Sequence, residues 1–497
     1  MATRSQTQHK KIILNKPMSE GGRGNGSLVN FKFASQERGI LRPIIDLKYD
    51  SNPPNNFEPV KVLVADGVVY ALGGDDNNRI AIYTISNVGK LSFENGSGQS
   101  IGRLSDAEYY ENDDGKFIYI VDTGGDISRY NLGTNSFDFD VETGFDSEAT
   151  SAFHNGTSIV YNHIDDSLYF LTGNEINVLN NTTFGTTPFK LNKTLNYNFI
   201  FIYGKYIGVV GSGNNKQYVQ FWNRDTSITT LSKSFIVNAD RVGAIGVLKG
   251  ELMMLVSNTT YGNDEEYKGD VTLLRYTGNG FNVSVSKLFV NEEQVRMIFN
   301  NIIDDEFYVH IDGYNDNFVD KSGLYRIDIY GNIRMVNSAS LNRYNDRFYS
   351  SVKVYKKLYS AMLYKDDTTG SKYAVGLIYS GSFDDFITTS EYITEVLFNE
   401  SSNRKQMTRF EISYQKLYDG HEEGHIYYRT SPLDDWTELG SVDYIQEKEK
   451  TGRANLYRKI IRPNTLPEFN EIQFKFTSKR GFTILRAGFN YLVKDYE

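Results

Sequence analysis

The chain has 497 residues, of which 39% are hydrophobic and 23% are charged, with a formal net charge of −9. This length exceeds what one compact core usually holds, and the composition excludes a disordered chain, so two or more folded domains are expected. The absence of cysteine excludes disulfides, thiolate metal sites and a cysteine nucleophile. No apolar run reaches the roughly 18 residues of a membrane helix, so we expect no membrane or secretion segment.

The first 27 residues are polar, basic and broken by glycines, which predicts a mobile arm. Residues 1–50 carry nine Lys/Arg and four Asp/Glu, whereas residues 51–402 carry 28 and 44, a net charge of −16. One interpretation is that the arm docks on a neighbouring copy, and the other is a solvated tail beside a solvated surface. The candidate assembly contacts are Arg4, Lys10, Lys11, Ile12, Ile13, Leu14, Lys16 and Arg23.

Alternating apolar and polar residues predict strands at residues 28–33 and 44–49, and then a unit of four strands recurs. We divide the repeats at residues 60–93, 107–140, 158–191, 199–232, 241–284, 296–336 and 351–393. The first hairpin of several repeats has an Asp/Asn/Gly turn followed by an apolar and aromatic strand, as at Asp66-Gly67, Asp165-Asp166 and Asp304-Asp305. Four-stranded sheets at such a period bury their faces by stacking in a ring, which predicts a β-propeller. We count seven blades, and moving one boundary would give six or eight.

Helical periodicity is almost absent, with residues 389–398 as the one place where a short helical turn competes, so the fold class is all-β. The composition changes at residues 399–403, and five or so short alternating strands follow, which suits a C-terminal β-sandwich. We interpret Trp436 in this part as a core residue, with a ligand platform as the alternative. The predicted domains are 1–50 (arm and leading strands), 51–402 (β-propeller) and 403–497 (β-sandwich).

The stretch from His421 to His425 reads HEEGH and matches the zinc-protease pattern H-E-x-x-H. That chemistry needs both histidines on one helical face, over a zinc-bound water. Segments with the alternating apolar and polar pattern of strands flank the stretch. Gly420 and Gly424 would each destabilise a helix interior by about 1 kcal/mol relative to Ala. We therefore expect a hairpin loop and no zinc.

Other catalytic signatures are also missing from the sequence. With two tryptophans in the chain, repeated sialidase boxes are absent, and the tryptophan–aspartate, kelch, P-loop and G-x-G-x-x-G patterns do not occur. Acid pairs suitable for glycoside hydrolysis are plentiful, but they mostly fall at expected turns. The acidic residues 262–270 lack the ligand spacing of a known calcium loop. We expect no enzyme activity, no catalytic residue, no metal and no cofactor.

The last strands carry a resemblance to a known group of proteins. Residues 454–493 contain a basic strand at Ile460-Ile461-Arg462, then Phe474-Lys475-Phe476, then Leu485-Arg486-Ala487-Gly488-Phe489. These strands, the leading residues 27–49 and the overall plan resemble the propeller-bearing tail hub or nozzle proteins of short-tailed bacteriophages.

The resemblance implies a structural virion protein that works by assembly, at the tail or neck. It implies copies of the chain in a ring, contacts with other phage tail or portal proteins, and synthesis in the host cytoplasm before assembly. It implies neither a membrane nor a sequence-specific nucleic acid as partner. The alternative is a glycan-binding or weakly glycosidic propeller of a tail tip, because the loops and central pocket of a propeller can bind sugars.

Overall fold

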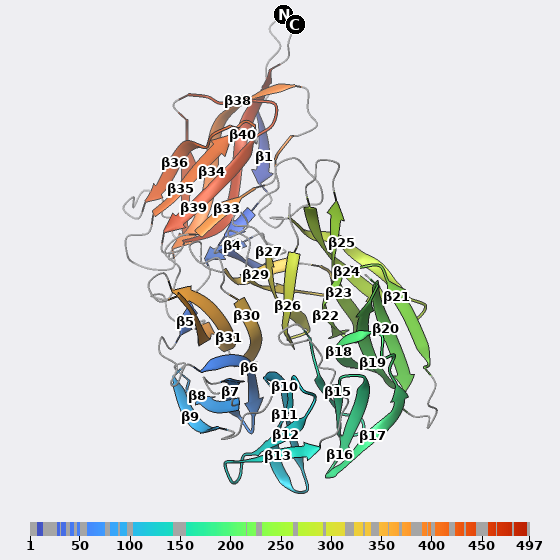
Figure 1. The fold of residues 1–497 in the computed structure, drawn as a ribbon. Helices are drawn as coiled ribbons and strands as arrows, with labels where there is room; N and C mark the ends of the chain where they lie inside the picture. Colours follow the sequence, from blue (N-terminus) through green and yellow to red (C-terminus); the bar gives the residue numbers. More distant parts are fainter. Residues whose placement is uncertain are drawn as a thin grey trace, which may run out of the picture. The chain divides into compact units, whose positions relative to one another are not determined.

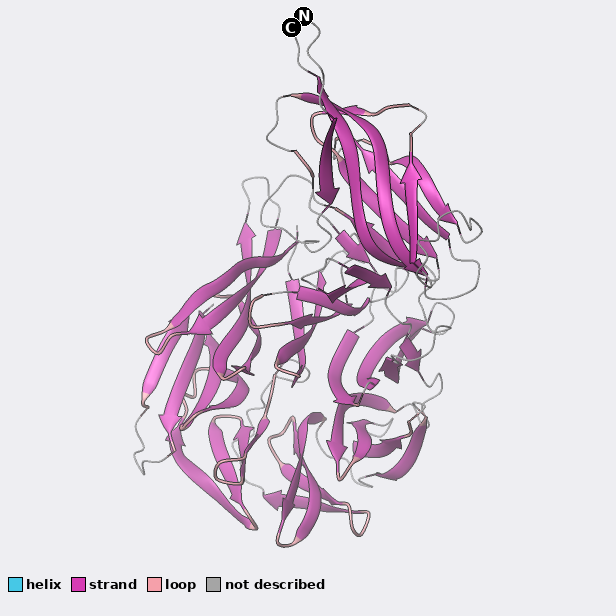
Figure 2. Ribbon diagram, turned by 180° about the vertical axis from the view of Figure 1, so that it is seen from behind, coloured by secondary structure: helices cyan, strands magenta, loops and turns pink. Residues whose placement is uncertain are grey.

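The computed structural model is all-β. It describes residues 7–12, 27–29, 31–35, 40–43, 47–49, 57–74, 80–87, 90–96, 103–142, 156–214, 216–224, 231–261, 267–291, 295–313, 323–331, 333–338, 347–355, 357–366, 370–378, 390–394, 396–398, 403–416, 423–431, 434–443, 456–463, 465–479 and 482–494. All the regular secondary structure in these ranges is β-strand (Figure 2). The predicted fold class is therefore confirmed. In the part of the chain that the structure describes, no helix qualifies as a membrane span.

The chain divides into two compact units. One consists of Leu47–Ile333 and Ala339–Ile378, and the other of Met1–Asp46, Arg334–Ser338 and Tyr379–Glu497. The predicted boundaries differ from this division at both ends. Residues before 47 group with the C-terminal part, and that part begins near residue 379 rather than 403. The physical reason is that strands from both ends of the chain pair in the same sheets.

The first unit is a propeller whose strands form seven four-stranded sheets among the described residues. Each of the first six blades uses four consecutive strands. The first three blades are β6 (Glu58–Ala65), β7 (Val68–Gly74), β8 (Ile80–Ile85) and β9 (Leu91–Gly96); β10 (Leu104–Asn112), β11 (Gly115–Asp122), β12 (Ile127–Asn131) and β13 (Ser136–Glu142); and β14 (Ile159–Asn162), β15 (Ser167–Thr172), β16 (Glu175–Asn180) and β17 (Thr183–Lys190).

The next three blades follow the same order. They are β18 (Asn196–Tyr203), β19 (Tyr206–Gly213), β20 (Lys216–Asn223) and β21 (Lys233–Val237); β22 (Arg241–Leu248), β23 (Glu251–Tyr261), β24 (Tyr267–Tyr276) and β25 (Phe281–Asn291); and β26 (Val295–Ile303), β27 (Glu306–Gly313), β28 (Gly323–Ile327) and β29 (Ile333–Ser338).

The seventh blade is assembled from two distant parts of the sequence. Its strands are β30 (Arg347–Val354), β31 (Lys357–Asp366), β32 (Gly370–Ile378) and, as the outer strand, β5 (Leu47–Tyr49). Tyr49 pairs with Gly376 and Leu47 with Ile378. Placing residues up to 393 in this blade was therefore wrong, because Ser390–Ile393 belongs to the other unit.

The ring closes through the first strand of each blade. β6 contacts β10, β10 contacts β14, and so on through β18, β22 and β26 to β30, which contacts β6 (Figure 1). Apolar side chains fill the spaces between neighbouring blades, as where Tyr110, Phe117 and Tyr119 pack with Ile159 and Phe170. Each sheet thus buries its faces against two neighbours, as the repeat predicted.

The second unit has two sheets. One contains β3 (Phe31–Ser35), β4 (Ile40–Pro43), β40 (Phe482–Lys494), β34 (Arg404–Lys416) and β37 (Leu456–Ile461) in this order, with β1 (Thr7–Ile12) on β40 and β38 (Glu468–Phe469) on β34. The other contains β2 (Ser27–Val29), β33 (Ser390–Ile393), β39 (Gln473–Lys479), β35 (Glu423–Arg429) and β36 (Thr437–Asp443). Their side chains share one core, in which Phe410 and Phe489 each lie 5.1 Å from Phe474, ring centre to ring centre. This is the arrangement of a β-sandwich.

Candidate functional site

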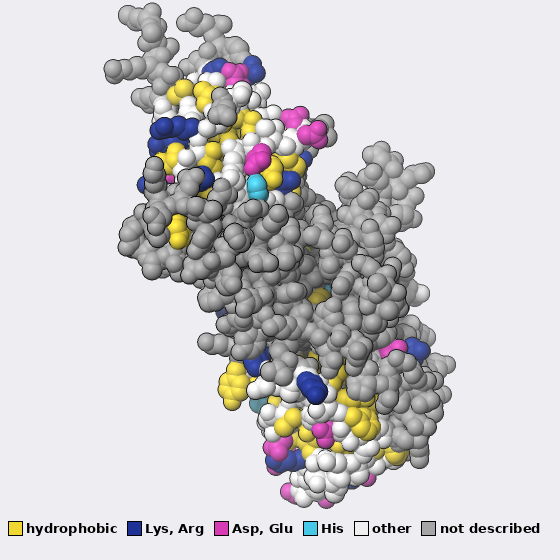
Figure 3. Space-filling view, turned by 90° about the vertical axis from the view of Figure 1, so that its left-hand side faces the viewer, with side chains coloured by type: hydrophobic (Ala, Val, Ile, Leu, Met, Phe, Trp, Pro, Cys, Tyr) yellow, Lys and Arg dark blue, Asp and Glu magenta, His cyan; other side chains and the backbone are white. Residues whose placement is uncertain are grey.

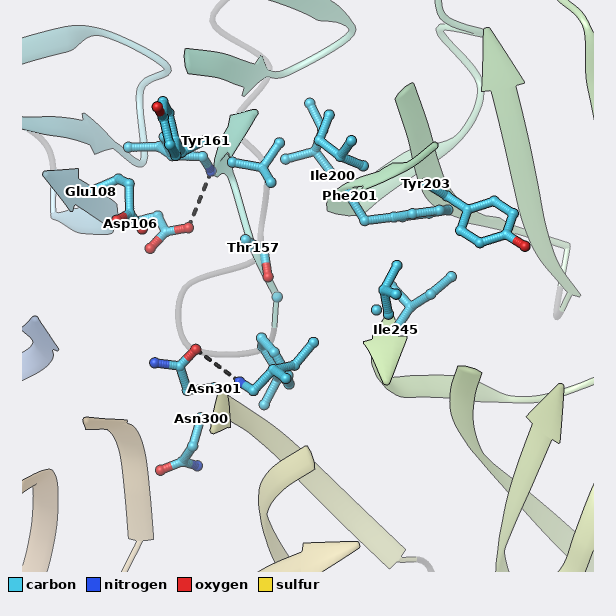
Figure 4. A pocket seen from close by; sticks show the side chains of 18 of the residues that line it. Asp106, Glu108, Thr157, Tyr161, Ile200, Phe201, Tyr203, Ile245, Asn300 and Asn301 are labelled. Carbon is cyan, nitrogen blue, oxygen red and sulfur yellow. Dashed lines mark hydrogen bonds between the residues drawn. The ribbon is translucent and has the colours of Figure 1, made fainter. Parts of the chain in front are cut away.

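The centre of the propeller ring holds a cavity of about 900 Å³. All seven inner strands contribute to its lining, from Lys61 on β6 to Ser350 on β30. In Figure 4, Asp106 and Glu108 lie on one side of this cavity, and Phe201 and Ile245 lie on the opposite side. We call this cavity the central cavity. It has a charged wall, formed by Asp106 and Glu108, and an apolar wall, formed by Phe201 and Ile245.

Pairs of consecutive residues face the central cavity because the inner strands are bulged. The pairing register shifts between Pro59 and Lys61, between Leu104 and Asp106, and at the equivalent places in β18, β22, β26 and β30. A regular strand shows alternate residues to one face, and a bulge re-aims one extra side chain. Ser105 and Asp106 accordingly both line the cavity.

Asp106 lies at the meeting point of three blades. Its Oδ1 accepts from Lys61 Nζ at 2.5 Å and from the backbone nitrogen of Ala107 at 2.9 Å. Its Oδ2 accepts from the backbone nitrogens of Ser158 at 2.8 Å and Ile159 at 3.1 Å. A carboxylate has about four acceptor positions, and here all four are used. Asp106 is suited to joining blades and poorly suited to attacking a substrate.

Glu108 lies two residues further along β10 and also lines the cavity. Burial raises its pKa above the ordinary value of 4.5, Lys61 opposes the rise and Asp106 adds to it. Burial alone would lower the pKa of Lys61, but the carboxylates of Asp106 and Glu108 reverse this and raise it. Lys61 therefore stays charged and interacts electrostatically with both carboxylates.

A second polar network joins the sixth blade to the seventh. Asn300 donates from Nδ2 to the carbonyl of Phe348 at 2.8 Å and accepts from Ser351 Oγ at 2.9 Å. Asn301 donates to the carbonyl of Ser351 at 3.0 Å. Nearby, Ser350 Oγ accepts from the backbone nitrogen of Val62 at 3.2 Å, which joins the seventh blade to the first. The polar groups of the cavity wall are thus largely engaged in holding the ring together.

The predicted assembly residues divide into two sets. Lys10, Lys11 and Ile12 lie in β1, which pairs with β40. Ile12 is 1% exposed in the sandwich core. The prediction of a mobile arm is therefore wrong for β1, because its backbone completes a sheet edge. The other candidate residues lie outside the described residues: Arg4, Ile13, Leu14, Lys16 and Arg23.

The H-E-x-x-H stretch is strand where it is described. Glu423–Arg429 forms β35, and the ring Nδ1 of His425 lies 2.8 Å from Glu438 Oε1. In a strand, residues four positions apart lie too far from each other to act as neighbours on a helical face do. His421 lies outside the described residues, as do residues 262–266 of the acidic segment 262–270. Among the described residues, no group of three metal-ligating side chains gathers.

Trp436 is half-buried rather than a core residue, so that interpretation was wrong. The guanidinium of Arg429 lies 4.5 Å from the ring centre and Lys475 Nζ lies 5.0 Å from it. Two cations on one indole keep it at the surface, where the charges stay hydrated. On the face drawn in Figure 3, described basic and acidic side chains are interspersed among apolar and uncharged ones.

The residues of the charged wall were not singled out from the sequence. Lys61, Asp106 and Glu108 are charged residues within the predicted inner strands of two repeats, and this is the signal that could have found them. The bulges hid it, because they shift the alternation by one residue at the point where each charged side chain turns inward.

Comparisons with known proteins give matches in structure only. No family model and no curated protein matches the sequence. The WD40 repeats of RRP9 match with a TM-score of 0.45 at 10% identity, over 68% of this chain and 100% of that one. The β-propeller domain of Myceliophteria thermophila Cps50 (Swd1) gives 0.39 at 9%, over 67% and 100%. The computationally designed Ika8 protein gives 0.36 at 7%, over 71% and 96%. The seven ring-forming sheets establish the propeller by themselves, and these distant matches say nothing about activity.

Proposed function

We propose that the chain is a structural component of a bacteriophage virion, a tail hub or nozzle or a neck or tail accessory protein, that acts by assembly. The observation that carries this proposal is the saturation of Asp106. This buried carboxylate of the cavity wall uses all four of its acceptor positions in hydrogen bonds that join three blades. Such a centre favours a rigid wall over a catalytic pocket.

The strands that carry the sequence resemblance support the same proposal. Phe474, Phe476 and Phe489 are fully buried in the shared core of the two sheets. The similarity to phage tail proteins therefore falls on residues that build the sandwich. A shared framework without a shared catalytic group is the pattern expected for proteins that work by assembly.

Mass spectrometry of gradient-purified phage particles tests the proposal. The particles would come from the host that carries the gene, and the chain is expected at a fixed copy number relative to the other tail proteins. Electron microscopy of the purified chain, alone or with those proteins, should show rings. Absence of the chain from mature particles would overturn the proposal, as would a permanently monomeric chain that joins no tail protein.

A glycan-binding propeller remains the second candidate, favoured by the size and lining of the central cavity. Tyr161, Tyr203, Tyr206 and Tyr349 line it, and aromatic rings with hydroxyl groups suit sugar faces. A glycan array probed with the purified chain tests this function. Binding that is lost in Glu108→Gln would favour it, and an array without signal would exclude it.

A further inference from the structure

β1 is a separate piece of the sandwich sheet. Its six residues pair antiparallel with one edge of β40, from Thr7 opposite Leu492 to Ile12 opposite Ala487. β40 is the strand that β1 contacts extensively, and β1 lies off the main order of the sheet. The pairing is therefore an addition to an edge that β40 offers.

The side chains of β1 divide between two faces. Ile12 enters the shared core, Lys10 Nζ lies 5.2 Å from the ring centre of Phe398, and Tyr491 donates from its hydroxyl to Gln8 Oε1 at 2.7 Å. His9 points to the exposed face, where its Nδ1 lies 2.8 Å from Asn490 Oδ1. β1 thus has one apolar anchor, one cation–π contact, two side-chain hydrogen bonds and a register set by its backbone.

Gly488 makes room for β1. A Cβ built on Gly488 would lie 3.0 Å from the carbonyl oxygen of Lys10 and equally close to the ring of His9. All three of the nearest atoms belong to β1. Gly488 therefore admits the close approach of this strand.

The sandwich core depends little on β1. Among the described side chains of that core, Ile12 comes from β1, and all the others come from residue 392 onward. Removing β1 would uncover one edge and one apolar position while the rest of the core stays in place. An edge strand with one anchor is the kind of element that can be exchanged between copies at low cost.

The sequence between β1 and β2 is long enough for such an exchange. Fourteen residues, 13–26, separate the two strands, and four of them are glycine. Fully extended, they could span up to about 45–50 Å, which is larger than a small domain. The backbone bonds of an antiparallel ladder are the same whether the strand belongs to the same chain or to another copy.

We propose that β1 is exchanged between copies of the chain, so that Thr7–Ile12 of one copy adds to β40 of its neighbour. This inference rests on the proposed assembly function and specifies the contact that links subunits.

Disulfide trapping tests the exchange, and the absence of cysteine in the natural chain makes every cross-link unambiguous. Two differently tagged chains, one with His9→Cys and one with Asn490→Cys, are co-expressed and oxidised. These residues are directly opposed and their side chains meet, which suits disulfide geometry. Exchange predicts a cross-linked product that carries both tags in most of the assembled material.

Two controls define the result. His9→Cys with Ile164→Cys, an exposed propeller position, should give no cross-link above background. Adding Gly488→Val to the Asn490→Cys chain should reduce the two-tag product at least tenfold, because the new side chain meets the backbone of β1.

The outcome that overturns the exchange is a cross-link confined to single chains. In that case the double variant with both His9→Cys and Asn490→Cys closes within one chain, and the mixed single variants give no two-tag product. Ring formation is scored separately by electron microscopy of the same samples. Rings without two-tag product reject the exchange alone, whereas absence of rings with the other tail proteins rejects the proposed function itself.

Discussion

Lys61 Nζ lies 2.5 Å from Asp106 Oδ1 and so joins the first propeller blade to the second. The Asp106 side chain is 5% exposed and that of Lys61 is 23% exposed, so the pair is shielded from most of the water. Because Asp106 also holds the backbone of Ser158 and Ile159, one carboxylate connects three blades.

The first prediction concerns this carboxylate. Asp106→Asn should lower the free energy of unfolding by about 3 kcal/mol, because the amide nitrogen cannot accept and leaves buried donors unpaired. Urea unfolding followed by fluorescence measures the change. The matched control is Asp66→Asn, which breaks the exposed pair with Lys116 and should leave the unfolding midpoint unchanged. Equal effects of the two variants would contradict the structural role of Asp106.

The second prediction concerns pH. Burial raises the pKa of Glu108 above 4.5, so the folded protein binds this proton more tightly than the unfolded chain. The stability that Glu108 contributes is complete below pH 4.5 and is lost as the pH rises through the folded pKa. Glu108→Gln has no charge to bury. As the pH rises from 4 to 7, the melting temperature of this variant should therefore increase relative to that of the natural chain. Glu111→Gln on the exposed face of the same strand is the control, and a gap that does not change with pH would refute the prediction.

The third prediction concerns the first hairpin. Gly67 has a φ of +78° and follows Asp66 at +47°, both in the left-handed region. A Cβ on Gly67 would meet nothing within 4 Å, so Gly67→Ala should destabilise by about 1 kcal/mol through backbone strain alone. Gly74→Ala also has open space and no positive φ, and it should cost nothing measurable. Thermal melting of the two variants decides, and similar losses would argue against strain at the turn.

The fourth prediction concerns the two tryptophans. Trp222 is 1% exposed in the propeller, whereas Trp436 lies half-buried between two cations in the other unit. The Trp436→Phe variant, which keeps Trp222, should emit at shorter wavelength and resist acrylamide. Trp222→Phe should be quenched several-fold more strongly. Equal quenching of the two variants would contradict the difference in exposure between Trp222 and Trp436.

Local features of the fold were predictable from the sequence because they depend on neighbouring residues. The turns at Asp66-Gly67, Asp165-Asp166 and Asp304-Asp305 all join the first two strands of a blade, and each contains a residue with positive φ. Short Asp and Gly residues accept that conformation, so composition alone marks them.

Long-range pairing was not predictable in the same way. β5 and β1 are short strands whose partners lie more than 300 residues away, in β32 and β40. The alternation of side chains says that a segment is extended but not which edge it joins. The cavity residues were missed for a related reason, since the bulge before Asp106 changes which residues turn inward.

The pairing of β5 with β32 also sets an order of events during synthesis. Leu47–Tyr49 leaves the ribosome first among the propeller strands, yet its partner Gly376–Ile378 is made more than 300 residues later. At about 5–20 residues per second the wait lasts tens of seconds. Both units need strands from the late part of the chain, so a product that ends before Gly376–Ile378 can close neither the ring nor the sandwich. Translation errors of this kind would yield chains open to proteolysis instead of defective subunits that enter an assembly.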